Sequence, residues 1–174
     1  DVQSGILDPV PRLAGYLTFS LKPKTDPRDS LRALGEESDG RDVVAGLGLS
    51  TVTAVCKKVE GLRTFPSLVG AGIEVPSTPK ALWCWLRGDD RGHLLHKARK
   101  IQKAVSPSFA PDKTIDAFQY GPSLDLTGYE DGTENPTGDK ANEVAVVRDQ
   151  GKGLDGSSFA AVQQWVHDLD RFEE

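Results

Sequence analysis

The sequence lacks several features that would assign it to a class at once. It has no methionine, only two cysteines and no excess of positive charge, because 21 Lys and Arg stand against 26 Asp and Glu. The net charge of −5 argues against a surface for nucleic acid. No apolar run approaches the ~20 residues of a membrane span, and the first residues lack the basic and apolar parts of an export signal. We therefore expect a soluble chain with neither a nucleic-acid nor a membrane partner.

The two cysteines do not form a metal-binding pattern. Cys56 and Cys84 each lie in an apolar segment, and neither has a second cysteine at ligand spacing. We predict that both are reduced core residues and that the chain has no metal site. The absence of methionine, together with Asp1 as the first residue, indicates a processed chain or an excerpt from a longer one.

The hydrophobic pattern of the first half predicts one strand-helix-strand unit. Its three parts cover residues 15–21, 23–34 and 42–50. A second short helix is predicted within 50–62, followed by a loop rich in Gly and Pro over 64–80. Gly46 and Gly48 resemble the start of a dinucleotide fingerprint, but Thr51 stands where the third glycine belongs, so close backbone packing is the favoured interpretation.

The same unit then recurs. A central strand is predicted over 81–88, an amphipathic helix over 89–105 with Asp89 or Asp90 as its cap, and a strand over 114–121. Two such units on one antiparallel sheet predict an α+β fold, a ferredoxin-like sheet with helices on one face, of the dimeric α+β barrel type. At 174 residues, one domain is expected.

Outside the two units, two further strands are predicted over 141–149 and 156–170, around a Gly-rich turn. In such a strand His167 would share a face with Phe159 and Trp165, so we expect it to be at least half buried. His93 and His96 fall among lysines on the long helix and are expected to be solvated.

The segment 128–136, GYEDGTENP, is the richest candidate site. It carries the carboxylates Glu130, Asp131 and Glu134. Pro136 excludes a glycosylation acceptor, and the pattern fails as an EF-hand at several ligand positions. A carboxylate-pair hydrolase would need two of the acids held across a sugar, which the sequence does not show. The structural alternative is a polar turn in which Asp131 caps its own backbone beside Gly132.

This loop, within LTGYEDGTENPTG over 126–138, resembles the signature of the dye-decolourising peroxidases. The shared positions are Gly128, Asp131, Gly132, Thr133, Asn135 and Pro136. The resemblance continues in order along the chain and is closest to the cytoplasmic members of the family. It is carried by the stretches VQSGIL, FPSLVGAG, EVAVVRD and AVQQWVHDLDRF.

The resemblance implies an enzyme that reduces hydrogen peroxide with haem b while oxidising dyes or phenolic compounds. Asp131 would be the catalytic acid–base residue on the distal face of the haem, and burial there would raise its pKa. Contacts to the cofactor are implied for the loop residues Asp131, Gly132, Thr133, Glu134 and Asn135. The two loop glycines would let the backbone approach the porphyrin, and Glu130 stands at a variable position.

The resemblance also implies that half of the site is missing. In the family the iron-ligating histidine and the distal arginine lie in a second ferredoxin-like domain, and no residue here matches either of them. Residues 1–174 are therefore expected to be the first domain of two, with hydrogen peroxide, small aromatic reductants and either a complementing domain or a homo-oligomer as partners. The implied location is cytoplasmic. The alternative is a non-catalytic porphyrin-binding or assembly module of the same fold.

Overall fold

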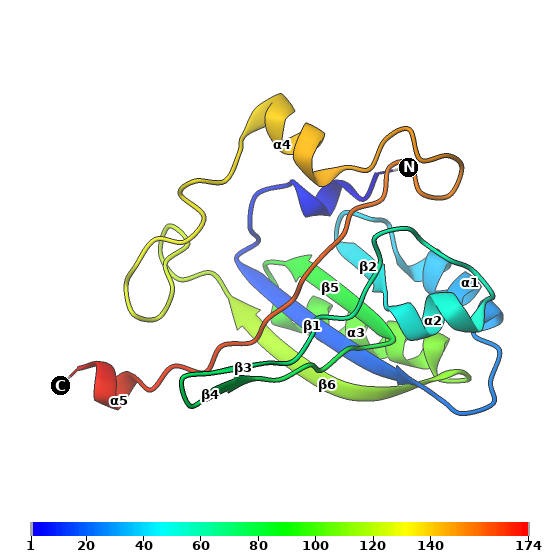
Figure 1. The fold of residues 1–174 in the computed structure, drawn as a ribbon, viewed down its shortest axis with the longest axis horizontal. Coiled ribbons are helices and arrows are strands. Elements are labelled where there is room, and N and C mark those ends of the chain that lie inside the picture. Colours follow the sequence, from blue (N-terminus) through cyan, green and yellow to red (C-terminus); the bar gives the residue numbers. More distant parts are fainter. Residues whose placement is uncertain (1, 174) are drawn as a thin grey trace.

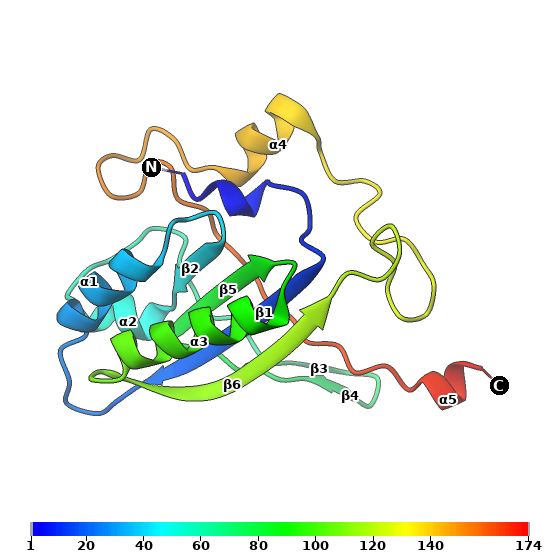
Figure 2. The ribbon, with the colours of Figure 1, turned by 180° about the vertical axis from the view of Figure 1, so that it is seen from behind.

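A computed structural model describes residues 2–173. Its centre is a four-stranded antiparallel sheet in the order β2-β5-β1-β6 (Figure 1). The strands are β1 (Leu13–Leu21), β2 (Val43–Leu47), β5 (Leu82–Gly88) and β6 (Phe109–Phe118). Helices α1 (Arg28–Glu37) and α3 (Arg91–Val105) cover one face, as Figure 2 shows. This is the predicted ferredoxin-like arrangement, with β5 in the interior of the sheet as expected.

The core lies between α3 and the sheet because both elements turn an apolar face to the same space. On β5, Leu82, Cys84 and Leu86 alternate with more exposed neighbours and are at most 1% exposed. From α3, Ile101 and Val105 complete this layer. Burying one large apolar side chain stabilises the fold by about 1.5–3 kcal/mol. The buried side chains of this layer therefore hold α3 against the sheet.

The first turn of α3 is capped by one of the two acids predicted for that role. The carboxylate of Asp90 accepts a hydrogen bond from the His93 backbone N–H at 2.8 Å. This contact satisfies an amide that would otherwise lack a partner, and it holds the pKa of Asp90 below its usual range. His93 and His96 on the outer face of this helix are exposed, as predicted.

The opposite face of the sheet is aromatic. Tyr16 of β1 stacks between Trp83 and Trp85 of β5, with ring centroids 6.2 Å apart in both pairs. All three rings are half-buried. The extended chain after residue 156 crosses this face, which Figures 1 and 2 show from its two sides. Gly46 of β2 lies beneath Trp83, where an added Cβ would meet the indole at 3.2 Å, so this glycine makes room for the Trp83 side chain of the neighbouring strand.

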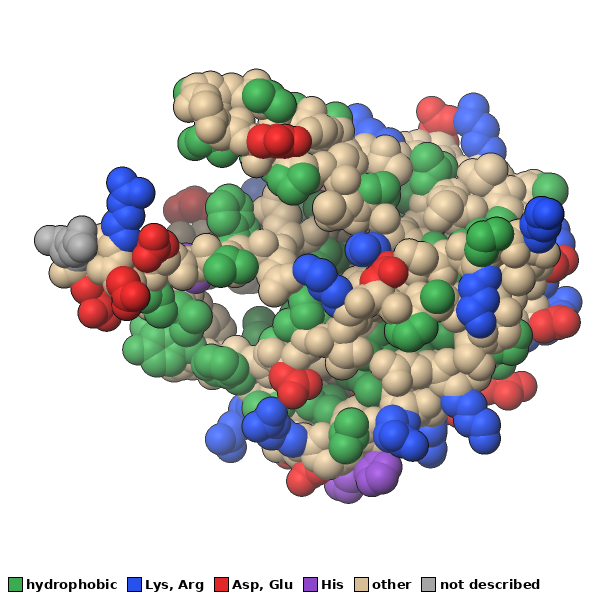
Figure 3. All heavy atoms as spheres, turned by 90° about the horizontal axis from the view of Figure 1, so that it is seen from below, with side chains coloured by type: hydrophobic (Ala, Val, Ile, Leu, Met, Phe, Trp, Pro, Cys, Tyr) green, Lys and Arg blue, Asp and Glu red, His purple; other side chains and the backbone are tan. Residues whose placement is uncertain are grey.

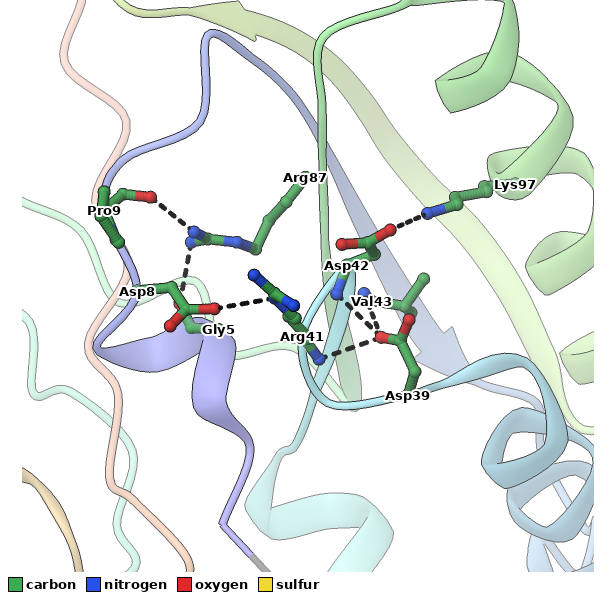
Figure 4. Close-up of polar contacts among 9 residues, drawn as sticks. All are labelled: Gly5, Asp8, Pro9, Asp39, Arg41, Asp42, Val43, Arg87 and Lys97. Carbon is green, nitrogen blue, oxygen red and sulfur yellow. Dashed lines mark hydrogen bonds and ion pairs between the residues drawn. The ribbon is translucent and has the colours of Figure 1, made fainter.

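An arginine of β5 contacts the N-terminal segment, which includes the single turn η1 (Ser4–Ile6) (Figure 4). The guanidinium of Arg87 donates to the carbonyls of Gly5 at 2.8 Å and Pro9 at 2.6 Å. It also lies 4.4 Å from the ring centroid of Trp85. Burial lowers the pKa of Arg87, while the charge of Asp8 acts in the opposite direction. Arg87 thus joins the N-terminal segment to the aromatic face.

Two predictions between β2 and β5 were inaccurate. Helix α2 (Leu49–Ala54) is shorter than predicted and begins after Gly48 rather than Ser50. Gly48 is required there because an added Cβ would lie 1.7 Å from the Lys80 carbonyl oxygen. Beyond the helix, Cys56 adopts a φ of 57° and is exposed, so its predicted place in the core was wrong. The chain leaves the core one residue after the helix ends, which carries the thiol outward.

The predicted loop over 64–80 contains a small hairpin, β3 (Leu68–Gly70) paired with β4 (Ile73–Val75). All its residues are exposed, and its tight turn uses positive φ angles at Ala71 and Gly72. Figure 3 shows hydrophobic side chains gathered at the end of the molecule that holds this hairpin and the C-terminal segment. Val69, Ile73, Trp165 and Val166 are each at least two-thirds exposed.

The two strands predicted after residue 140 are absent from the described part of the chain. Helix α4 (Gly138–Ala145) occupies most of the first segment. The second is extended without strand pairing up to the short helix α5 (Leu169–Phe172). Alternation of apolar residues favours a strand only where a neighbouring strand supplies a ladder of hydrogen bonds. The two segments share only the hydrogen bonds of Val147 with Gly156 and Ser157 in the described chain, which do not form such a ladder. His167 is accordingly exposed, which corrects its predicted burial.

The described residues include no helix that is long and apolar enough to cross a membrane.

Candidate functional site

The candidate loop lies outside the sheet, in the excursion between β6 and α4 that is yellow in Figure 1. Isolated bridges pair Leu124 with Tyr120 on one side and with Glu130 on the other. The base of the excursion is therefore ordered by local pairing, whereas residues 131–137 project beyond it. All of residues 128–138 are exposed.

The turn just before the predicted site is organised by Asp125. Its carboxylate oxygen Oδ1 accepts hydrogen bonds from the Thr127 backbone N–H at 2.8 Å and from the Thr127 hydroxyl at 2.5 Å. A longer contact of 3.4 Å comes from the Tyr129 N–H. These hydrogen bonds, led by that of the Thr127 side chain, hold the pKa of Asp125 below its usual range. The position of Asp125 at the foot of the loop was not predicted.

The glycines of the loop occupy conformations that other residues rarely adopt. Gly128 has a φ of 90° and Gly132 a φ of 74°. The Asn135 N–H donates to the Gly132 carbonyl at 3.0 Å, which closes a turn. An added Cβ at Gly132 would lie 2.6 Å from the Asn135 amide nitrogen. The predicted tight bend at Asp131-Gly132 is therefore present, and Asn135 closes it from the other side.

The structure places the five predicted site residues, Asp131, Gly132, Thr133, Glu134 and Asn135, in one continuous exposed bend. Among the residues that the structure describes, no hydrogen bond or ion pair reaches the Asp131 carboxylate. The side chain is thus accessible to a ligand or to another part of a larger protein. The bend contains no histidine, and no group of three potential metal-ligating side chains occurs within 2–173.

Two small cavities lie at the aromatic face. One cavity of about 40 Å³ lies between Trp83 and the C-terminal segment. Another of about 50 Å³ lies between Trp85 and Val10. Pockets for drug-sized ligands measure roughly 300–1,000 Å³. A large planar group such as a porphyrin would therefore contact this chain from outside, and the open space around Gly128, where an added Cβ would meet nothing within 4 Å, permits that approach.

Sequence reasoning missed two features of this region. The first is Asp125, although an Asp followed two residues later by Thr is a recognisable side-chain-to-backbone turn pattern. The second is the stack of Tyr16 with two tryptophans, which requires knowledge of the β1–β5 register. Only the positions of Trp83 and Trp85 on a common face of β5 could be inferred from alternation.

Comparison with known proteins finds similarity to one family. The family model described as "Dyp-type peroxidase, C-terminal" matches residues 122–174, which include the whole candidate loop. A dye-decolourising peroxidase of Mycobacterium tuberculosis is 30% identical over 112 residues, covering 64% of this chain and 33% of the relative. Over these residues the chain is similar to dye-decolourising peroxidases. A dye-decolourising peroxidase of Rhodococcus erythropolis is 29% identical over 111 residues, with the same coverage.

Solved structures of dye-decolourising peroxidases have a similar fold. DyPB from Rhodococcus jostii superposes with a TM-score of 0.73 at 24% identity, covering 90% of this chain and 55% of that protein. A putative Dyp-type peroxidase of Shewanella oneidensis gives a TM-score of 0.76 at 23% identity, covering 87% and 54%. The chain thus has the fold of these dye-decolourising peroxidase structures. It spans about a third of the length of the curated relatives that it matches.

Proposed function

We propose that the chain supplies the distal side of a haem peroxidase site, in which Asp131 is the acid–base residue. The observation that carries the proposal is the family match across residues 122–174, which contains the bend that presents Asp131. The accessible carboxylate and the open backbone at Gly128 support it. A variant of the Rhodococcus jostii protein is known in complex with haem, and haem b is the cofactor that we propose here.

The chemistry follows from where the groups of this chain would lie. Bound haem supplies the iron at which hydrogen peroxide is reduced and from which oxidising equivalents pass to a dye or phenolic reductant. Asp131 would take a proton from peroxide and return it to the departing oxygen. The two loop glycines and Asn135 hold the bend in the form that presents this acid. Enclosure by a porphyrin would remove Asp131 from water and raise its pKa toward the range of an effective base.

The proposal requires further protein. In this chain Asp131 is exposed and the cavities at the aromatic face are small. The exposed apolar side chains of the hairpin and of residues 159–172 form a surface that a second domain would cover. We propose that residues 1–174 act as the first domain of a two-domain peroxidase, and that the second domain supplies the iron-ligating histidine and a distal arginine.

The alternative function is a non-catalytic porphyrin-binding or assembly module. It is favoured by the same exposure of Asp131, since a structural turn needs no enclosure. The encapsulated Dyp-type peroxidase of Mycobacterium smegmatis shows that one structure of this fold is housed in a larger assembly. A homo-oligomer and a cytoplasmic location are proposals that rest on the resemblance alone.

An Asp131→Asn substitution separates the two functions. In the haem-loaded protein completed by the second domain, we expect peroxide-driven dye oxidation to fall by about 10²–10⁴-fold, the usual contribution of a general acid–base group. Haem absorbance should be retained. Glu130→Gln is the matched control, because it removes the neighbouring exposed carboxylate. Equal activity of the Asp131→Asn and unmodified proteins would reject the acid–base role. If both of these proteins bind haem and neither oxidises the dye, the non-catalytic module is favoured.

A further inference from the structure

We propose that Asp125 is the positioning residue of the Asp131 bend, holding the backbone of residues 125–129 in a closed turn from which the acid is presented. The inference rests on the function proposed for Asp131 and deepens it. The comparisons match a region without assigning a role to Asp125. Asp125 lies six positions before Asp131 and makes no contact with it, so its effect passes through the intervening backbone.

Side chain and main chain of Asp125 act together on the same turn. Its backbone N–H donates to the Tyr129 carbonyl at 2.9 Å, and its carbonyl accepts from the Gly128 N–H at 3.0 Å. The three hydrogen bonds to the Asp125 Oδ1 atom from Thr127 and Tyr129 lie within the turn that these two backbone hydrogen bonds close. Five interactions therefore converge on one residue within a five-residue segment. Few other local interactions hold the bend, since residues 128–138 bury no side chain.

The geometry explains how a constraint at Asp125 reaches Asp131. The closed turn ends at Tyr129, and Glu130 then bridges back to Leu124 beside it. Asp131 is the next residue, and the positive φ of Gly132 reverses the chain directly after it. The backbone of Asp131 is thus fixed on one side by the Asp125 turn and on the other by the Gly132–Asn135 turn. Without the first, only the isolated bridges of Leu124 to Tyr120 and Glu130 would order the described chain between β6 and Asp131.

The charge of Asp125 strengthens these contacts. Hydrogen bonds that end on a carboxylate are about twice as strong as neutral ones. The Thr127 and Tyr129 donors lower the pKa of Asp125, and the charge of His167 in the C-terminal segment contributes in the same direction. Since the folded pKa lies below the ordinary value of 3.8, the turn is held at all pH values above that and weakens as the pH falls through the folded pKa.

Nuclear magnetic resonance of the chain without haem tests the proposal independently of peroxidase activity. In the unmodified chain, the Thr127 and Tyr129 amide protons should shift with pH at a midpoint below 3.8. In Asp125→Ala these shifts should disappear, and the Asp131 and Gly132 amides should move to random-coil positions. Asp125→Asn retains an accepting oxygen and should keep most of the turn at neutral pH. Asp139→Ala, which removes an exposed acid of α4, is the matched control.

The outcomes are decisive in both directions. Unchanged Asp131 and Gly132 amides in Asp125→Ala would overturn the proposal, and so would equal loss of the turn in the Ala and Asn variants. His167→Ala should raise the Asp125 midpoint slightly without abolishing the turn. Loss of the turn in His167→Ala would assign the positioning role to the C-terminal segment instead.

A second measurement connects the turn to the proposed chemistry. In the haem-loaded, completed protein, Asp125→Ala should reduce kcat for peroxide by on the order of tenfold, the effect of a misplaced catalytic group. The Asp125→Asn variant should retain most of the kcat of the unmodified protein. If the Ala variant lost activity only through unfolding, this difference between the two variants would not be expected. If the completed protein shows no peroxidase activity in any variant, the proposed function fails, while the resonance result still decides the role of Asp125 in the turn.

Discussion

At the scale of single residues, the surroundings rather than the residue type determine the chemistry. The two cysteines illustrate this. Cys84 faces the core from β5, and burial raises its pKa to about 12. Cys56 stands exposed after α2. The thiolate is the reactive form, so a buried thiol with a raised pKa is inert whereas an exposed one is open to reagents.

We therefore expect the two thiols to react in separate phases. In the native chain at pH 8, Ellman's reagent should release one equivalent of thiolate quickly, from Cys56, and the second only after denaturation. The Cys56→Ser variant should lose the fast phase and leave the slow one unchanged. Simultaneous reaction of both thiols in the folded chain would contradict the buried position of Cys84.

The candidate acid shows the same dependence on surroundings. Asp131 sits in a well-formed bend, yet within residues 2–173 it has neither burial nor a partner. Its residue type and its glycine neighbour were sufficient to predict the turn. They are not sufficient to make it an acid–base residue, because nothing in the described chain surrounds the carboxylate. That property would come from whatever encloses the side chain.

At the scale of elements, the contacts that join segments distant in sequence explain the arrangement of the sheet. Arg87 of β5 links the sheet to the N-terminal segment through the carbonyls of Gly5 and Pro9, while its guanidinium lies over the indole of Trp85 on its own strand. The amide of Gln3 adds a second link, because it both donates to and accepts from the Ala45 backbone of β2. The N-terminal segment thereby covers part of the outer edge of β2, which would otherwise offer free hydrogen-bonding groups.

Removal of the Arg87 side chain should loosen this segment. We expect Arg87→Ala to lower the free energy of unfolding by about 2–4 kcal/mol, since it leaves two carbonyls without a charged donor and removes a cation–π contact. Urea denaturation monitored by tryptophan fluorescence would measure the change. Arg41→Ala is the control, because Arg41 pairs with Asp8 at the surface and its loss should cost less than about 1 kcal/mol. Equal effects of the two substitutions would show that the Arg87 contacts contribute little.

At the scale of the whole molecule, the chain consists of a packed part and an extended part. Residues 13–118 contain the sheet, α1, α3 and nearly all of the core. Residues 119–173 contain the candidate loop, α4 and the segment that crosses the aromatic face. Between 158 and 167 no backbone hydrogen bond to another part of the described chain occurs, and the one side-chain hydrogen bond from this stretch to the sheet among the described residues is that between Lys113 and Gln164.

This division predicts the order of proteolysis. Trypsin should cut first at exposed sites outside the sheet, such as Lys140, Arg148 and Lys152, before it cuts within α3. Mass spectrometry of early digestion products would identify the sites. If the second domain covers the extended part, its addition should delay these early cuts. Initial cleavage inside α3 would contradict the division into a packed and an extended part.

Local pattern was sufficient to predict the packed part of the fold. The two repeated units, the central place of β5 and the buried face of α3 all follow from alternation or helical spacing within one segment, where side-chain direction is set by the backbone itself. The bend at Asp131-Gly132 was predictable from its glycine, whose positive φ reverses the chain locally, although within residues 2–173 the Asp131 carboxylate does not cap the turn as predicted.

What only the tertiary structure decided are the features that depend on a distant partner. Residues 156–170 have the alternation of a strand, but 158–167 form no backbone hydrogen bonds with a neighbouring strand in the described chain, and His167 is exposed. Cys56 lies in an apolar stretch, yet the end of α2 turns it outward. The two carbonyls that hold Arg87 lie about eighty positions away in the chain. A hydrogen bond or an apolar contact needs both of its partners, and the order of residues along one segment does not state where the second one lies.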